Sequence, residues 1–203
     1  TKPGYSIIDL VDRPKDQLTR SVRFRAGIDN FATKSEGSEK STIGIDADNV
    51  LNLNDSWSLT HIGSFDTNAL AVSGSFPMGY WTHGLAYSYS DYLSPIDSNT
   101  QLFGRSETKT LNTKFRFYKS KTGSVDFTAS IDKKFSDRVI NDVELADQKM
   151  TVGRLGASFS YLSNYSLSGS ASWSHGLEWF DATKDVDLSG ASPRAQFDKV
   201  QFN

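Results

Sequence analysis

Few side chains in this 203-residue chain have the types and spacing that catalysis or metal binding requires. Cysteine is absent, which excludes disulfides and thiolate metal sites. The three histidines are His61, His83 and His175. None stands at ligand spacing from another, so we predict interfacial or packing roles for all three. The many serines come with no phosphate-binding glycine loop, nucleophile elbow or Ser-His-Asp arrangement, so we expect neither an enzyme nor a cofactor.

Two acidic clusters have oxygen ligands of the kind that calcium prefers. They are Asp46-x-Asp48, followed by Asn49, and Asp185-x-Asp187. Neither continues into a twelve-residue loop that closes with a glutamate, as a calcium-binding loop between helices does. We therefore predict that these carboxylates are solvated acids and that the chain has no metal site.

A larger set of charged residues occupies the polar positions of segments in which apolar and polar residues alternate. The set comprises Arg23, Arg25, Asp29, Asp46, Lys114, Arg116, Asp126, Asp132, Lys134 and Arg154. Both signs occur, and serines and threonines lie among them. Lining a hydrated channel, such a surface would let a disordered polar chain slide past without gripping it. The alternative for any one residue is that the charges only neutralise one another across the wall.

The elements that would position these residues are extended strands. The alternation is clearest between Ser124 and Phe135. One face there carries Val125, Phe127, Ala129 and Ile131, and the other carries Asp126, Thr128, Ser130, Asp132 and Lys134. The same pattern recurs around Val22–Asp29, Thr42–Asp48, Leu111–Tyr118 and Ser166–Ser174. A period of two requires extended backbone, so we predict an all-β chain with almost no helix.

The links between the predicted strands alternate between short and long. We predict short links at Asn49–Asp55, Pro77–Tyr80, Lys119–Gly123 and Leu162–Tyr165. We predict long links, rich in Ser, Asp, Asn and Gly, at Phe31–Lys40, Leu93–Thr108, Ser136–Asp147 and Phe180–Gln196. One short link, Asp66–Asn68, falls where a long one is due. Short periplasmic turns and long outer loops are typical of an antiparallel transmembrane β-barrel, which is the fold class that we predict.

The composition agrees with a wall that has lipid on one side and water on the other. Hydrophobic residues make up 37%, and no run of about eighteen apolar residues exists, which excludes transmembrane helices. Aromatic residues make up 12% and concentrate near predicted strand ends, as interfacial girdles do. They include Trp57, Tyr80, Trp81, Tyr89, Tyr92, Tyr118, Tyr161, Tyr165 and Trp173. The net charge of -2 gives no reason to expect nucleic acid as a partner.

Both ends of the sequence indicate a portion of a longer chain. Thr1–Ile8 has neither the basic start nor the apolar stretch of a signal peptide, although an outer-membrane protein must be exported. Ala195–Asn203 begins a strand with no partner after it, and an open edge in lipid would leave backbone groups unpaired. We count about nine strands and the start of a tenth. Closed bacterial barrels have even strand numbers, so we expect more wall beyond Asn203.

Four motifs stand out from the alternation. The first, SVRFRAGIDNFATKSEGSEKSTIGIDADNVLNLNDSWSL, contains Asp29, Asn30, Asn49 and Asp55. The second, SFPMGYWTHGLAYSYSDY, contains the turn of Pro77, Gly79, Tyr80 and Trp81. The others are WSHGLEWFDA, with Gly176 and Leu177, and SPRAQFDKVQF, with Phe197. In this order the motifs resemble the barrel of TpsB transporters, the outer-membrane half of bacterial two-partner secretion, over nearly the whole chain.

The resemblance implies about nine to ten strands from the N-terminal portion of a sixteen-stranded barrel that is fed by two periplasmic POTRA domains. Residues 1–19 would link the POTRA region to the barrel portion at residues 20–203. Such a barrel passes an unfolded exoprotein, namely a haemolysin, an adhesin or a contact-dependent inhibition toxin, across the outer-membrane bilayer, and a monomer is implied. The plug helix would precede Thr1, and the lumenal Val-Arg-Gly-Tyr/Phe loop would follow Asn203, so no gating residue is assigned.

Two other classes of protein would also contain alternating strands. A passive porin or an outer-membrane assembly factor would have the strands without the ordered motifs. A soluble β-sandwich adhesin or binding module would bury its apolar faces in a core, whereas here the aromatic residues cluster at strand ends as much as at strand centres. Rows of Val, Ile, Phe and Leu buried against a second layer would therefore contradict the barrel.

Overall fold

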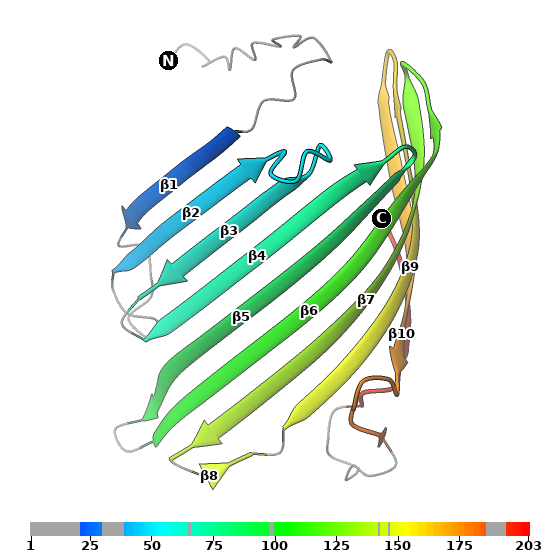
Figure 1. Cartoon of the computed structure of the whole chain (residues 1–203). Helices are drawn as coiled ribbons and strands as arrows, with labels where there is room; N and C mark the ends of the chain where they lie inside the picture. The colour runs from blue at the N-terminus through cyan, green and yellow to red at the C-terminus, as the bar shows by residue number, and fades with distance from the viewer. Residues whose placement is uncertain are drawn as a thin grey trace.

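A computed structural model of the chain is an antiparallel sheet with eleven strands among the described residues (Figure 1). The structure describes residues 21–29, 39–64, 66–97, 100–141, 143–145, 147–185 and 194–203. The strands are β1 (Ser21–Asp29), β2 (Lys40–Asp48), β3 (Ser56–Gly63), β4 (Thr67–Met78), β5 (Trp81–Asp97), β6 (Thr100–Lys119), β7 (Gly123–Ile140), β8 (Val143–Glu144), β9 (Gln148–Leu162), β10 (Ser166–Leu177) and β11 (Asp198–Phe202). The predicted linker at residues 1–19 and the motif residue Asn30 lie outside these ranges. No helix in the described residues is long and apolar enough to cross a membrane.

Strands that follow one another in sequence lie side by side in the sheet. The order is β1-β2-β3-β4-β5-β6-β7-β9-β10-β11, and the two-residue β8 pairs with β7. Figure 1 shows the sheet curling from β1 at one edge round to β9 and β10. In the described part of the chain β1 and β11 do not pair, so the sheet is an open, partial barrel. The all-β, antiparallel barrel portion that the alternation predicts is confirmed.

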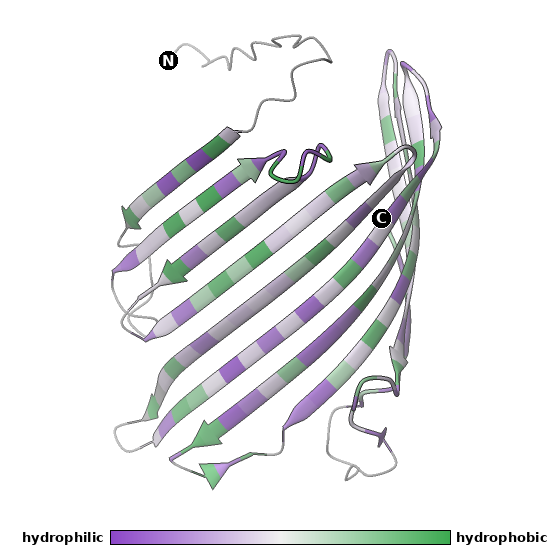
Figure 2. Cartoon of the chain, in the orientation of Figure 1, coloured by the Kyte–Doolittle hydropathy of each residue, from purple (hydrophilic) through white to green (hydrophobic). Residues whose placement is uncertain are grey.

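The sheet is one layer thick, and no second layer covers its apolar face in the described part of the chain. Phe24 is 76% exposed and Leu111 is 67% exposed, although both are large and apolar. The buried apolar residues among those described are Val152, Ala182 and Ala195. Figure 2 shows apolar and polar residues alternating along β1 and β2. A β-sandwich would bury the apolar rows between two sheets, so the sandwich alternative is excluded.

The short links lie at the predicted places, but one predicted long link is wrong and another is shorter than predicted. The turns between β2 and β3, β4 and β5, β6 and β7, and β9 and β10 all lie at one end of the sheet (Figure 1). Leu93–Thr108 is not a loop, because β5 continues to Asp97 and β6 begins at Thr100. Asp91 and Arg105, paired across these strands, place charges on one face of the stretch, and Ser90 and Ser106 place hydroxyls on the other. Polarity on both faces is typical of a loop, which explains why the sequence predicted a loop here.

Strands β5, β6 and β7 are much longer than a bilayer requires. They contain 17, 20 and 18 residues, whereas a tilted transmembrane strand needs about 9–11. Their surplus lies at the end away from the short turns (Figure 1). The predicted Ser136–Asp147 loop is also shortened, because β7 continues to Ile140 and β8 follows. The sheet therefore extends well beyond its apolar band on one side.

A β-bulge on β6 changes the alternation near the short-turn end. The register shifts between Arg116 and Tyr118, so that Tyr118 lies opposite Val125. The bulge adds one residue to β6, and Phe117 contacts Phe127 with ring centroids 5.9 Å apart. Phe117 and Tyr118 therefore both lie on the apolar side of the sheet, which strict alternation does not predict.

Candidate functional site

The strand register places the predicted channel-lining residues on one face of the sheet, which we call the polar face. Residues directly opposite one another in an antiparallel pair share a face. One such row crosses the sheet through Asp46, Ser58, Ser73, Ala86, Thr110, Asp132, Val152 and Gly176. Counting by twos from this row reaches Arg23, Arg25, Asp29, Asp46, Lys114, Arg116, Asp126, Asp132, Lys134 and Arg154. The side chain of Asp29 lies outside the described residues.

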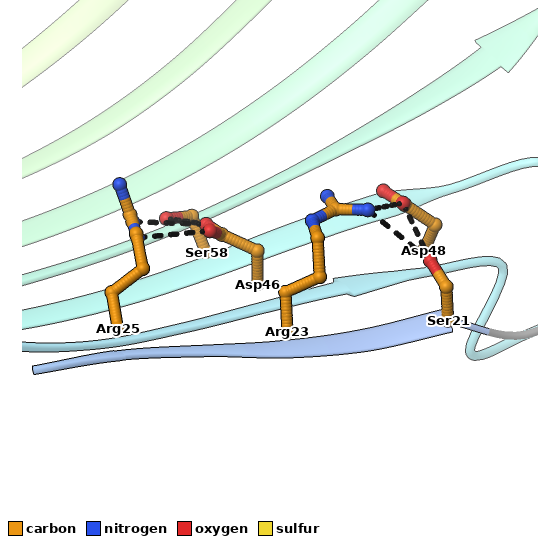
Figure 3. A network of polar contacts seen from close by, with 6 residues as sticks. All are labelled: Ser21, Arg23, Arg25, Asp46, Asp48 and Ser58. Carbon is orange, nitrogen blue, oxygen red and sulfur yellow. Dashed lines mark hydrogen bonds and ion pairs between the residues drawn. The ribbon is translucent and has the colours of Figure 1, made fainter.

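Two ion pairs join β1 to β2 on the polar face (Figure 3). Arg23 Nη1 lies 2.7 Å from Asp48 Oδ2, which a serine hydroxyl of β1 also contacts. Arg25 Nε lies 3.1 Å from Asp46 Oδ2. Ser58 Oγ of β3 donates a hydrogen bond of 2.8 Å to Asp46 Oδ1. Asp46 and Asp48, predicted to be only solvated acids, are therefore ion-paired with arginines.

A second set of polar contacts runs from β6 to β10. Thr110 Oγ1 donates a hydrogen bond of 2.7 Å to Asp132 Oδ1. Arg154 Nη1 lies 3.3 Å from the other carboxylate oxygen, and Arg154 Nε donates to Ser174 Oγ at 3.3 Å. Asp132 is only 6% exposed, and burial of a carboxylate requires such partners. Four strands are thus tied together through one aspartate and one arginine.

The remaining predicted charges divide into one pair and two lysines. Arg116 Nε lies 2.8 Å from Asp126 Oδ1 across β6 and β7. Among the described residues Lys114 and Lys134 have no ion pair. Each arginine of the predicted set is therefore neutralised by an aspartate on a neighbouring strand, as the alternative interpretation expected. The sequence did not single out Ser58, Thr110 and Ser174 as partners, although each falls on the same alternation phase.

The motif residue Asp55 holds the turn between β2 and β3. It is 1% exposed, and its carboxylate accepts hydrogen bonds from Trp57 Nε1 at 2.7 Å, Leu51 N at 3.0 Å and Leu53 N at 3.2 Å. Burial raises the pKa of the Asp55 carboxyl, but these hydrogen bonds outweigh it and hold that pKa below its ordinary value. Asp55 therefore acts as a charged centre around which the turn folds.

Asparagines supply the backbone conformations that this turn needs. Asn49, Asn52 and Asn54 have φ of 55°, 59° and 57°, in the left-handed region that asparagine tolerates better than most residues. Asn49 Oδ1 also accepts a hydrogen bond of 3.1 Å from Asn54 N. The motif residues Asn49 and Asp55 therefore both stabilise the turn between β2 and β3.

The motif residues Pro77, Gly79, Tyr80 and Trp81 form the hairpin between β4 and β5. Met78 pairs with Trp81, and Gly79 has a φ of 62° at the first of the two turn positions, as in a type II′ turn. The Tyr80 carbonyl accepts a hydrogen bond of 2.8 Å from Arg116 N, and the Trp81 and Phe115 rings lie 4.6 Å apart. Hairpin and neighbouring strand are therefore fixed together by an aromatic pair on the apolar face.

The third and fourth motifs meet at the other end of the sheet. Gly176 N donates a hydrogen bond of 2.9 Å to the Phe197 carbonyl. A Cβ atom added to Gly176 would overlap the Ala195 carbonyl oxygen and would lie 2.9 Å from Gln196 Cα. Leu177, beside Gly176, is the last residue of β10. Only glycine lets the returning chain pass so close to the strand.

Replacing Gly176 by valine should loosen the segment at residues 194–197 without unfolding the sheet. The added side chain must push backbone away, and overpacking of this kind costs about 1–3 kcal/mol. Limited proteolysis of the folded protein should then cut faster near this segment. The matched change Gly27→Val on β1, where nothing lies within 4 Å of the added Cβ, should leave the cleavage rate unchanged. Equal cleavage of both variants would contradict the close approach.

Asp185 is not the solvated acid that the sequence predicted. Its Oδ1 accepts hydrogen bonds from Ala195 N at 2.6 Å and Gln196 N at 3.3 Å, and Asp185 N donates to Gln196 Oε1 at 2.6 Å. Asp185 thereby fastens the residues after β10 to those before β11. The other residue of this acidic pair, Asp187, lies outside the described residues. In the described ranges no group of three or more His, Cys, Asp or Glu side chains could hold a metal.

His83 and His175 form local pairs on the apolar face, and His61 of β3 lies on that face opposite Ile43 and Leu70. His175 Nδ1 lies 2.9 Å from Asp198 Oδ1, and Trp173 Nε1 donates to the same oxygen at 3.0 Å. His83 Nδ1 lies 3.1 Å from Thr113 Oγ1. Each contact bridges neighbouring strands, which is consistent with the predicted packing roles.

Comparison with known protein families identifies the family of this chain. The model of the haemolysin secretion/activation protein ShlB/FhaC/HecB matches residues 4–203. The chain belongs to this family. The resemblance to TpsB transporters that the four motifs carry is confirmed with it.

Individual curated proteins are similar to almost the whole chain. The outer membrane transporter CdiB of Dickeya dadantii (strain 3937) is 26% identical and covers 98% of this chain and 37% of its own length. CdiB of Escherichia coli O6:K15:H31 (strain 536 / UPEC) is also 26% identical, over 35% of its length. The chain thus spans about a third of the curated relatives it matches.

Solved structures confirm the architecture. CdiB from Escherichia coli superposes with a TM-score of 0.82 at 25% identity, covering 89% of this chain and 36% of the other. CdiB from Acinetobacter baumannii superposes with a TM-score of 0.61 at 22% identity, covering 78% and 32%. The second likeness concerns the fold alone. In both, this chain corresponds to a minority of the transporter.

Proposed function

We propose that this chain is the N-terminal wall of an outer-membrane pore that moves an unfolded partner exoprotein from the periplasm to the cell surface. Residues 20–203 would be the barrel portion, and residues 1–19 would link it to a periplasmic POTRA region. The observation that carries the proposal is the two-sided single layer, accessible and apolar on one face and polar on the other, in a member of the ShlB/FhaC/HecB family. We further propose that the pore acts as a monomer without catalysis or cofactor.

The apolar face supports a location in the lipid bilayer. Its exposed side chains include Phe24, Leu111, Phe127 and Leu155. Water would be an unfavourable surrounding for so many large apolar groups, since each buried one gains roughly 1.5–3 kcal/mol. Hydrocarbon would accommodate them without a second layer of protein.

The polar face supports passage of a chain rather than tight binding. The four arginines of the predicted set are already paired, as Arg116 is with Asp126 and Arg154 with Asp132. Serines and threonines make up much of the rest, and β10 alone presents five serines there, at Ser166, Ser168, Ser170, Ser172 and Ser174. A hydrated face of compensated charges offers a passing polypeptide few strong anchors. Affinity for the exoprotein would then reside in other parts of the transporter.

The proposal predicts that secretion depends on the whole transporter that contains this chain. A strain that expresses it with a candidate two-partner exoprotein should expose that exoprotein to protease added outside intact cells. Without the transporter the exoprotein should stay in the periplasm. If the exoprotein remained periplasmic while the transporter was folded in the outer membrane, transport of that class of client would be contradicted.

A passive porin is the second candidate, and its open wall would look much the same. Conductance in planar bilayers separates the two functions. A porin should conduct steadily, whereas a plugged transporter should open only intermittently. Steady conductance by the full-length protein would favour the porin.

A further inference from the structure

Three lysines lie close together on the otherwise apolar face of β6, β7 and β9. Lys109 lies directly opposite Lys133, and Lys149 lies opposite Phe135, two residues further along β7. Like charges directly opposite one another across two strands are destabilising. The stability of the sheet therefore gives no reason for this arrangement, which we call the lysine cluster.

The charge of the lysine cluster is only partly compensated. Lys109 Nζ lies 2.9 Å from Glu107 Oε1, and Asp181 lines the same hollow of about 300 Å³. Among the described residues the side chains of Lys133 and Lys149 have no ion pair or hydrogen bond. Three ammonium groups thus face two carboxylates, which leaves the hollow positively charged.

An apolar groove of about 510 Å³ lies on the same three strands and on the neighbouring β10. Leu111, Ile131, Leu155, Trp173, Leu177 and Trp179 contribute its large side chains. Ala129 and Gly153 lie among them, and their small size creates the hollow. The groove faces away from the polar face, because Leu111, Ile131 and Gly153 belong to one row of the register.

The lysine cluster and the groove adjoin one another along the strands. Leu111 is two residues from Lys109 on β6, and Ile131 is two residues from Lys133 on β7. Two residues of a strand span about 7 Å. A molecule with an apolar chain in the groove would therefore place its head among the ammonium groups. The cluster lies toward the end of the sheet that is opposite the short turns (Figure 1).

We propose that this surface is a binding site for a single bilayer lipid with an anionic, phosphate-bearing headgroup. Its acyl chain occupies the groove, and its phosphate lies between Lys109, Lys133 and Lys149. Lysine binds phosphate as a compact point charge, and basic clusters at the edge of an apolar surface favour anionic lipid headgroups. The proposal rests on the membrane location proposed above, and it places the lipid in the leaflet nearer the cell surface.

The test uses the full-length transporter in detergent, with diphosphoryl lipid A as the probe. Native mass spectrometry should show lipid A retained, and phosphatidylcholine of equal chain length should be released first. Inorganic phosphate in excess should not displace the lipid; complete displacement would assign the site to free phosphate instead. The measurement needs no exoprotein, so failure of secretion and failure of lipid binding are distinguishable.

Two sets of variants test the two halves of the site. The triple change Lys109→Gln, Lys133→Gln and Lys149→Gln should weaken retention by at least about tenfold. Ala129→Phe should fill the groove and weaken retention with every lysine in place. Lys114→Gln, on the opposite face of β6 and outside both hollows, is the matched control and should bind as the unaltered protein does. Unchanged retention by the triple variant, or equal loss in the control, would overturn the proposal.

Discussion

Replacing Phe127 by arginine should lower the ratio of folded to unfolded protein by roughly 30-fold or more. Phe127 lies on the apolar face, opposite Phe115 and Ala157 in the register, and is 46% exposed in the isolated sheet. An arginine on the lipid face near the middle of the bilayer costs roughly 2–4 kcal/mol. A loss of that size consumes much of the stability of a typical folded protein. Heat-modifiable migration of the outer-membrane fraction in gels measures the folded share.

The control for this prediction is the same residue type on the other face. Ser158 lies opposite Asp126 on the polar face, so the change Ser158→Arg would place a guanidinium beside a carboxylate and water. We expect Ser158→Arg to fold at nearly the level of the unaltered protein. If both variants folded equally well, the apolar face would not contact lipid, and the proposed membrane location would be contradicted.

Replacing Asp55 by asparagine should have the second largest effect. The change keeps the size of the side chain but removes the negative charge that Trp57 Nε1, Leu51 N and Leu53 N contact. Hydrogen bonds to charged groups are worth more than neutral ones, so we expect the ratio of folded to unfolded protein to fall about tenfold. The same heat-modifiability assay, run over a range of denaturant, measures it. Asp66→Asn, in the link between β3 and β4, is a matched control and should have little effect.

The lowered pKa of Asp55 predicts how stability varies with pH. A carboxyl whose pKa is lower in the folded state contributes stability above the pKa that it has when unfolded. That contribution is lost as the pH falls through the lowered folded pKa, below about 3.9. The unaltered protein should therefore lose this part of its stability in acid, and the Asp55→Asn variant should not. Parallel acid curves for the two proteins would contradict the assignment.

Alternation predicted the strands and the faces of their residues because a period of two is a property of the sequence itself. It placed Arg23, Asp132 and Arg154 on one side, and the register agrees. The hydrogen-bond and ion-pair partners of these residues were harder to predict from the sequence. Which hydroxyl reaches Asp132 depends on the register between β6 and β7, and a bulge or a one-residue shift changes it.

Two other features could not have been read from the pattern. The extension of β5 and β6 through Leu93–Thr108 is stabilised by pairing between the strands, while its side chains are as polar as those of a loop. The lysine cluster consists of three residues far apart in sequence, at Lys109, Lys133 and Lys149. Each looks like an ordinary solvated lysine by itself, and only the alignment of three strands brings them together.

The surplus length of β5, β6 and β7 determines how far the sheet extends outside the bilayer. The ten residues of β6 from Thr100 to Lys109 would rise roughly 25 Å above the bilayer in a tilted strand. On the proposed orientation, the wall of the pore would extend further outside the cell at β5–β7 than at the shorter strands β1–β4. An exoprotein leaving the pore along these strands would then pass a wall of β-sheet outside the bilayer before it reached open solvent.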